Sequence, residues 1–276
     1  MKVISFLKPL AHAEKEAYLK SKTGASIGYD DHEGWVQSFY DRGFLIDVAR
    51  HQLNASFFEH EETESIVTFL KHVQSLKVKK VIYLLPANIQ VSKKNADVIN
   101  EKITVLIKLG QKYKMMTIIE PTTQSYKSLM YVIKAFKSSQ LGVVFSPSHI
   151  VKTQGTTLGQ YRLFKKYIQY FVCHDMTKDL KPALIGYGNS QLLSLFKRLK
   201  KDAYKGQFIL DPPFEDMLTS FQKSRKSVFK IFRKKELSKY EQLKSMLHLT
   251  EDKPEIQLAE IYHHQYEVLN TIFRLR

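Results

Sequence analysis

Four side chains able to carry out acid–base chemistry or to bind a metal follow short apolar segments of the sequence. Glu120, His149, His174 and Asp211 each stand at or just after the end of such a segment. Carboxylates can accept and return a proton, and carboxylates with imidazoles bind divalent metal ions. If the segments are parallel strands of a barrel, their carboxyl ends gather at one face, where catalytic groups collect. The placement indicates a lyase or isomerase that uses, or once used, a metal.

Eight apolar segments suit strands, and helical patterns alternate with them. Segments 81–85, 116–119 and 141–145 are nearly continuous apolar runs, which is typical of strands buried on both faces of a parallel sheet. The order of strand then helix predicts an α/β fold, a (β/α)₈ TIM barrel, with an open doubly wound sheet as the alternative. Strands are expected near residues 2–7, 25–30, 44–50, 80–85, 116–120, 141–145, 169–173 and 207–211, and helices near 11–22, 33–42, 62–76, 95–113, 124–138, 157–167, 189–203 and 214–235.

The chain is predicted to form a single domain. Residues 1–213 would supply the strands and helices of the barrel, and residues 214–276 the eighth helix and a C-terminal helical extension packed on it. Pro254 divides these extra helices into two groups, because proline interrupts a helix. The extension could mediate a homodimer or cover the barrel.

Composition excludes several classes of protein. The single cysteine, Cys173, allows no internal disulfide and fits a reducing compartment. No apolar run is long enough for a signal peptide or a membrane span, so a soluble cytoplasmic protein is expected. The net charge of +16 is typical of nucleic-acid binding, but residues 214–276 carry only +3 of it, so no basic arm is present. Basic residues between 162 and 205 recur at helix spacing, which favours a solvated helix face.

Four segments together resemble a known family. They are Thr117–Pro121, Gly142–His149, Phe171–Asp175 and Gly206–Asp211. Their order and intervals are similar to the xylose isomerase-like TIM barrels, which include sugar-phosphate isomerases and epimerases, keto-acid isomerases, dehydroshikimate dehydratases and endonuclease IV. The resemblance covers residues 80–213, and residues 1–79 only in outline.

The resemblance implies a divalent metal ion, Mn, Co, Zn or Mg, at the barrel mouth. Glu120 matches the first metal-binding Glu of the family, and Asp211 stands where its closing Glu is usual. His149 keeps a histidine that follows an Asp by three residues, but Ser146 replaces that Asp. A serine hydroxyl is a poor substitute for a carboxylate, so this replacement puts the metal in question.

A second departure from the family pattern lies on the next strand. Val172 stands where the family has a strand histidine, and Asp175 matches the Asp that follows it. Because side chains alternate along a strand, His174 points to the same side as Val172 and could reach a metal displaced outward. Glu120, His149, His174 and Asp211 are therefore the candidate metal ligands.

Substrate binding is assigned to Ser146, Asp175 and a glycine-rich segment. Gly186, Gly188 and Asn189 precede the last predicted helix and strand, where barrels commonly bind phosphate through backbone N–H groups. Plainer structural interpretations stand beside these roles: a βα turn for the glycines, and a helix-capping pair for His174 and Asp175.

The leading hypothesis is a sugar or sugar-phosphate isomerase/epimerase. It would act on a small, polyhydroxylated, anionic substrate, with Glu120 and Asp211 moving a proton between adjacent carbons. Asp211, which precedes two prolines, could instead end its strand with an Asx turn. The alternative function is a barrel without catalysis that binds a small anionic ligand or a protein partner. An endonuclease IV-like enzyme is the least favoured, because residues 176–190 lack the further Asp-x-His motif that a three-metal site would need.

Overall fold

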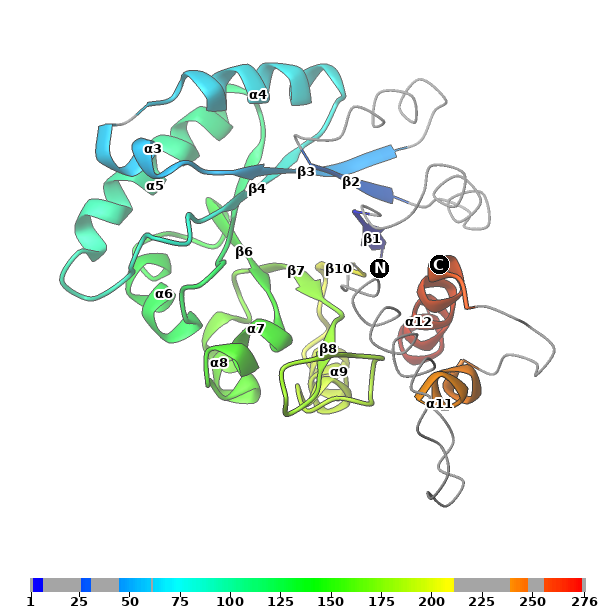
Figure 1. The fold of residues 1–276 in the computed structure, drawn as a ribbon. Coiled ribbons are helices and arrows are strands. Elements are labelled where there is room, and N and C mark those ends of the chain that lie inside the picture. Colours follow the sequence, from blue (N-terminus) through cyan, green and yellow to red (C-terminus); the bar gives the residue numbers. More distant parts are fainter. Residues whose placement is uncertain are drawn as a thin grey trace, which may run out of the picture.

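Eight parallel strands close into a barrel. The computed structural model describes residues 2–6, 26–30, 45–60, 62–210, 239–247 and 256–274. Within these residues the strands neighbour one another in the order β1-β10-β7-β6-β5-β4-β3-β2, and every pair is parallel (Figure 1). The barrel prediction is confirmed, and the open sheet is excluded. The strands are β1 (Val3–Ser5), β2 (Ser26–Asp30), β3 (Leu45–Gln52), β4 (Lys80–Leu84), β5 (Met116–Glu120), β6 (Leu141–Phe145), β7 (Ile168–Val172) and β10 (Gln207–Ile209).

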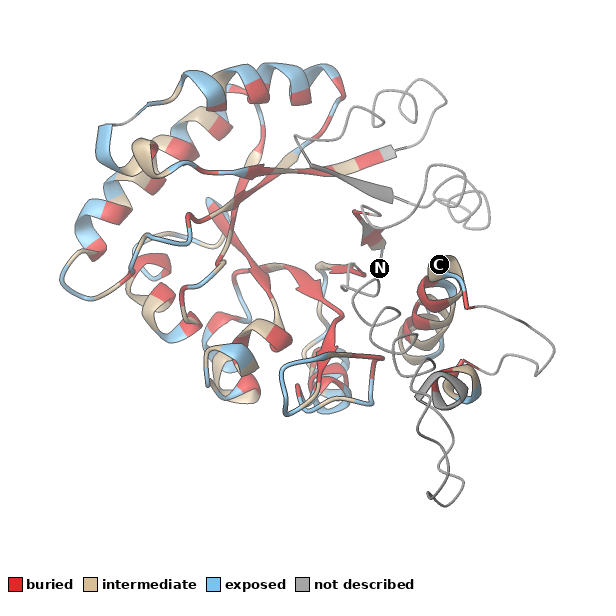
Figure 2. Cartoon of the chain, viewed as in Figure 1, coloured by how far each residue is buried: buried red, intermediate tan, exposed pale blue. Residues whose placement is uncertain are grey.

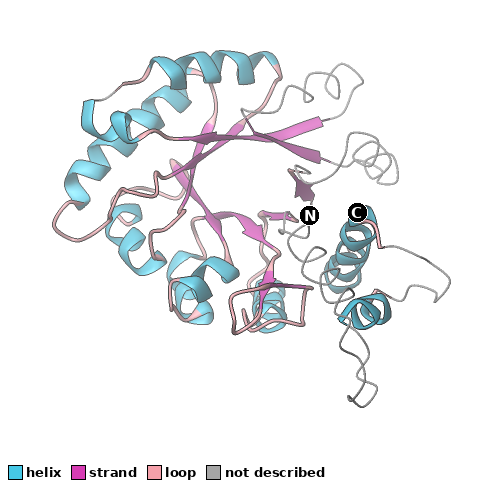
Figure 3. Ribbon diagram, viewed as in Figure 1, coloured by secondary structure: helices cyan, strands magenta, loops and turns pink. Residues whose placement is uncertain are grey.

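Helices cover the outside of the barrel (Figure 3). Five predicted helices are confirmed: α4 (Glu64–Ser75), α5 (Ala96–Lys112), α6 (Tyr126–Ile133), α8 (Thr157–Phe164) and α9 (Leu192–Lys201). The helices expected at 11–22, 33–42 and 214–235 lie outside the described residues. Three short features were not predicted: α3 (Ala55–His60), α7 (Pro147–Lys152) and a hairpin of β8 (Asp175–Met176) and β9 (Pro182–Ala183).

The hydrophobic core has two parts, as the two faces of each strand require. Inside the barrel, inward-facing side chains form one cluster, and a larger cluster lies between the strands and the helices. On α4, Ile66, Phe69, Leu70 and Val73 are buried, as their three-and-four spacing predicts. Figure 2 shows the buried residues concentrated on the strands and on the helix faces that meet them. The inner cluster comprises Ile4, Phe6, Val48, Ile82, Ile118, Val144, Tyr170, Val172 and Ile209.

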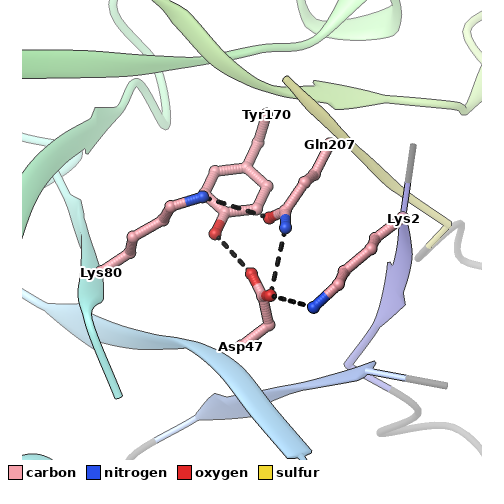
Figure 4. A network of polar contacts seen from close by, with 5 residues as sticks. All are labelled: Lys2, Asp47, Lys80, Tyr170 and Gln207. Atoms are coloured by element: carbon pink, nitrogen blue, oxygen red, sulfur yellow. Dashed lines mark hydrogen bonds and ion pairs between the residues drawn. The ribbon is translucent and has the colours of Figure 1, made fainter. Parts of the chain in front are cut away.

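A polar network lies near the amino-terminal end of the barrel (Figure 4). The β2–β3 register passes from Ile46 to Val48, so Asp47 is the extra residue of a bulge, a feature that re-aims side chains. Asp47 accepts hydrogen bonds from Tyr170 Oη at 3.0 Å and Gln207 Nε2 at 3.1 Å, and Lys2 Nζ lies 3.6 Å away. Burial, then Asp47, raises the pKa of Tyr170. The network satisfies polar groups at the opposite end from the predicted site.

Asp47→Asn should therefore lower the free energy of unfolding by about 1–3 kcal/mol, because an amide nitrogen cannot accept these bonds. Urea unfolding at pH 7 measures the loss. Lys2→Gln is the control, since the Lys2 side chain is 51% exposed and its ion pair should contribute roughly 1 kcal/mol or less. Equal losses in the two variants would contradict a central role for Asp47.

The described C-terminal helices are α11 (Lys239–Met246) and α12 (Leu258–Phe273). The Phe273 ring on α12 packs against Phe196 of α9 and Phe208 of β10, with centroids 5.3 and 4.6 Å apart. Buried Gln265 accepts a hydrogen bond from the Ile185 N–H at 2.6 Å. Helix α12 thus lies against the outer side of the barrel and holds the segment after β9. No helix in the described ranges combines the length and apolar character needed to span a membrane.

Candidate functional site

A polar cavity of about 270 Å³ lies at the carboxyl end of the barrel strands. Its lining includes Glu120, Ser146, His149 and His174, which the structure brings together as the sequence predicted. Val172 and Ile209 add apolar surface. Asp211 follows β10 but lies outside the described residues. We call this cavity the mouth pocket.

Glu120, the last residue of β5, forms an ion pair across the mouth pocket. Arg50 Nε on β3 lies 3.2 Å from Glu120 Oε2, and the two side chains are only 13% and 18% exposed. The Arg50 guanidinium carbon lies 3.7 Å from the centroid of the Phe6 ring, within cation–π distance. Arg50 was not assigned a role from the sequence, although its place near the end of β3 follows the same rule that selected Glu120.

Ser146 lines the mouth pocket and also begins α7. Its Oγ accepts a hydrogen bond from the His149 N–H at 3.3 Å, which makes it the N-cap of that helix. Its own N–H donates to Tyr126 Oη at 2.7 Å, and Tyr126 donates in turn to the Val144 carbonyl. The residue that replaces the expected Asp is therefore fixed by the local fold.

His149 lines the mouth pocket but is bound to the backbone. Its Nε2 lies 2.8 Å from the Gln124 carbonyl oxygen, so Nε2 carries the proton and donates. Burial lowers the pKa of His149, and the Gln124 contact partly opposes this shift. A neutral imidazole with Nε2 engaged has only Nδ1 left to accept a bond from a ligand or to bind a metal.

His174 is the most deeply buried titratable group of the mouth pocket, at 8% exposure. Its Nδ1 lies 3.3 Å from Ser148 Oγ, whereas Nε2 is buried and has no hydrogen-bond partner among the described residues. Burial, with a smaller effect from Lys152, lowers the pKa of His174 to about 4. The ring is therefore neutral at pH 7.

The free energy of unfolding should fall by roughly 3 kcal/mol between pH 6.5 and 4 on account of His174, at about 1.4 kcal/mol per pKa unit. In that window the unfolded chain binds a proton that the folded chain excludes, so stability decreases as pH falls. Above pH 6.5 the ring is neutral in both states, and the contribution of His174 to the free energy of unfolding is fully present. Urea unfolding across this range tests the shift.

His174→Gln should remove most of this pH dependence. His149→Gln is the matched variant. Because the pKa of His149 is also lowered, this variant should also reduce the loss of stability at low pH. A pH profile unchanged by His174→Gln would show that His174 titrates normally.

Asp175 is bound by the backbone of the glycine-rich segment. Its carboxylate accepts hydrogen bonds from the N–H groups of Met176 (2.9 Å), Gly186 (3.1 Å), Gly188 (3.1 Å) and Ser190 (3.0 Å). A Cβ on Gly188 would lie 2.2 Å from Asp175 Oδ1, which requires glycine there.

The glycine-rich segment uses its backbone donors within the fold. The N–H groups of Gly186 and Gly188, for which phosphate binding stays a prediction, donate to the Asp175 carboxylate. Asn189 donates its N–H to the Met176 carbonyl. Asp175 is 1% exposed and faces these amides, so its described contacts are structural.

The described donors do not fit the metal site that the sequence resemblance implied. Among the described residues, no three His, Cys, Asp or Glu side chains are grouped so that they could hold a metal ion. Glu120 is paired with Arg50, His149 Nε2 with a carbonyl, and Val172 offers no donor.

A larger cavity, of about 390 Å³, lies near the start of β7 and β10, at the opposite end of the strands. It is lined by Lys165, Lys166 and Lys205, together with Asp202 at the C-terminus of α9. Lys165 and Lys166 directly follow α8, and lysines at helix C-termini are favoured by the helix dipole and by unpaired carbonyls, so these two charges have a structural explanation. The mouth pocket, which holds the acid–base groups, is the candidate active site.

Comparison with known proteins agrees with this architecture. The family described as Xylose isomerase-like TIM barrel matches residues 55–230, whereas no curated protein matches the sequence. Similar solved structures include IolI protein with a binding zinc atom (TM-score 0.64, 11% identity, covering 99% of this chain and 98% of that one). A D-tagatose 3-epimerase-like protein has a TM-score of 0.59 at 14% identity, covering 81% and 97%. The 3-keto-D-glucoside 4-epimerase YcjR from E. coli has a TM-score of 0.58 at 11% identity, covering 76% and 90%.

At these identities the structural likeness shows the fold alone. The family match is the stronger finding, because it covers more than half of the sequence and includes every described residue of the mouth pocket except Arg50. The chain belongs to the xylose isomerase-like TIM barrel family.

Proposed function

We propose that the chain is a sugar or sugar-phosphate isomerase/epimerase that moves a proton on a small anionic carbohydrate at the barrel mouth. The observation that carries the proposal is the Glu120 carboxylate, held 3.2 Å from Arg50 in a polar pocket at the carboxyl ends of the strands. The names of two similar structures, a tagatose epimerase-like protein and a ketoglucoside epimerase, support this reaction class.

The size and charge of the mouth pocket support the substrate class. About 270 Å³ accommodates a small molecule rather than a polymer. Arg50 and Lys152 outnumber Glu120 among the described charged residues of its lining, so an anionic substituent is favoured. Ser146, Ser148 and the histidines offer hydrogen-bonding groups for hydroxyls.

The proposed reaction is proton transfer next to a carbonyl. Glu120 removes the proton from the carbon beside the carbonyl, and the electron pair moves to the carbonyl oxygen, giving an enolate. Asp211, whose place after β10 comes from the sequence, starts protonated and gives its proton to the opposite face of the same carbon in an epimerisation. In an isomerisation the proton of the hydroxyl on that carbon passes to the enolate oxygen, the hydroxyl oxygen becomes the new carbonyl, and Asp211 protonates the former carbonyl carbon. Exchange with solvent then restores both carboxyl groups. His149 and His174 act as auxiliary hydrogen-bonding groups.

Solvent exchange tests the reaction class without knowledge of the product. Candidate aldoses, ketoses and their phosphates are incubated with the protein in D₂O, and NMR follows deuterium at the carbon beside the carbonyl. Exchange with any of them supports the proposal. If none exchanges, although one or more of them raises the melting temperature, the proposal fails in favour of binding without catalysis.

Binding without catalysis is the second candidate function. Two residues favour it. Ser146 caps a helix and Val172 is apolar, and both stand at positions where the family pattern has metal ligands. The partner would be a small anionic ligand or a protein.

A further inference from the structure

Resting on the proposed function, we propose that Arg50 supplies the fixed positive charge that the family resemblance assigns to a divalent metal. Its guanidinium, together with the Nε2–H of His174, would bind the developing oxyanion of the substrate. The mouth pocket would then stabilise the enolate with two protein groups that need no metal.

Arg50 is positioned as a permanent cation. Its guanidinium stacks at 3.7 Å on the ring of Phe6, which is 1% exposed, and its Nε contacts Glu120 at 3.2 Å. An arginine is not deprotonated in proteins and presents five N–H donors. Preorganised donors of this kind stabilise charge that develops in a transition state.

The two replaced ligand positions agree with this role. Val172 belongs to the apolar cluster inside the barrel, and the Ser146 hydroxyl caps α7. Neither brings the negative charge that a divalent ion requires. Lys152 also lines the mouth pocket. The described side chains therefore add positive charge there, instead of the negative charge that would attract a metal ion.

A chain of hydroxyls orients His174. The His149 N–H donates to Ser146 Oγ, which lies 3.1 Å from Ser148 Oγ, and Ser148 Oγ lies 3.3 Å from His174 Nδ1. When Ser146 donates to Ser148 and Ser148 to Nδ1, each hydroxyl proton has an acceptor and the ring proton resides on Nε2. That nitrogen is buried and without a partner in the described structure.

An unmatched buried donor is costly to the folded protein. A ligand oxygen entering the mouth pocket, which His174 lines, would satisfy it. Arg50 lines the same cavity, and the proposal places the oxyanion between these two groups.

Calorimetric titration with inorganic phosphate, in the presence of a chelator, tests the proposal. The wild type should bind phosphate without metal, Arg50→Gln should bind about tenfold more weakly or worse, and Arg50→Lys should be intermediate. His174→Leu should lose several-fold in affinity. Lys166→Gln, which removes one exposed positive charge outside the mouth pocket, should leave binding unchanged.

The Glu120→Gln variant distinguishes a protein cation from a bound metal ion, because the two predict opposite changes in phosphate affinity. It removes one negative charge beside Arg50, so phosphate should bind several-fold more tightly, whereas loss of a metal ligand would weaken binding. The proposal is overturned if the wild type binds no phosphate, if binding requires added Mn²⁺, or if Arg50→Gln has no effect. If Arg50→Gln alone does not fold, the double variant Arg50→Gln/Glu120→Gln, which removes both charges of the ion pair, replaces it in the titration.

The exchange experiment in D₂O fails or succeeds independently of this titration. Phosphate binding that depends on Arg50, without solvent exchange on any sugar, would keep the anion site and reject the proposed enzyme. Exchange that is abolished by the chelator would keep the enzyme and reject Arg50 as its cation.

Discussion

Glu120→Gln should lower the rate of solvent-deuterium exchange on an active sugar by about 10²–10⁴-fold, the usual contribution of a general base. The amide keeps the shape of the side chain but cannot accept the proton from carbon. Its oxygen can still lie beside the Arg50 guanidinium, so the pocket geometry should be preserved. Exchange rates measured by NMR at saturating sugar give the loss in turnover directly.

Glu101→Gln is the matched control for this variant. Glu101 lies exposed on α5, and the same change of carboxylate to amide there should leave exchange unaltered. Melting temperatures of both variants show whether an effect arises from unfolding. Exchange that persists at the wild-type rate in Glu120→Gln would assign the base to another residue.

The barrel was predictable because strands buried on both faces leave a strong pattern. The β4, β5 and β6 segments are apolar almost throughout, since one face meets the barrel interior and the other the helices. The hairpin of β8 and β9 left no such pattern, because its strands have only two residues each. It is held by contacts, such as those of Asp175, that depend on the folded chain.

The candidate site was predictable where a side chain ends a strand. Glu120 and His174 reach the mouth pocket for that reason, and His149 reaches it from the first turns of α7. Lys152 was missed because it lies within α7, a helix too short to show periodicity, and Arg50 because an ion pair between β3 and β5 depends on barrel closure.

The glycine-rich segment shows how one pattern can serve two purposes. Glycines before a helix were interpreted as a phosphate-binding turn, and the backbone N–H groups do bind an anion. The anion is Asp175, eleven residues before Gly186, so the chain provides its own ligand. Sequence alone does not distinguish the two cases, because both need a backbone without a Cβ.

Asp175→Ala should lower the free energy of unfolding by about 3–5 kcal/mol, the range for removing one partner of a buried charged group. Four N–H groups that now donate to the carboxylate would face a cavity. Asp175→Asn should also destabilise, because an amide nitrogen would point hydrogens at two of these donors. Urea unfolding at pH 7 measures both losses.

Asp179→Asn, an exposed position in the turn between β8 and β9, is the control and should change stability by roughly 0.5 kcal/mol or less. Formate offers a second test, since a small carboxylate can enter the space that Asp175→Ala leaves and accept the same bonds. Formate should therefore raise the melting temperature of Asp175→Ala and not that of the wild type. A loss from Asp175→Ala as small as that of the control would mean that the four N–H groups find other acceptors, and the segment would then regain the capacity to bind a substrate anion.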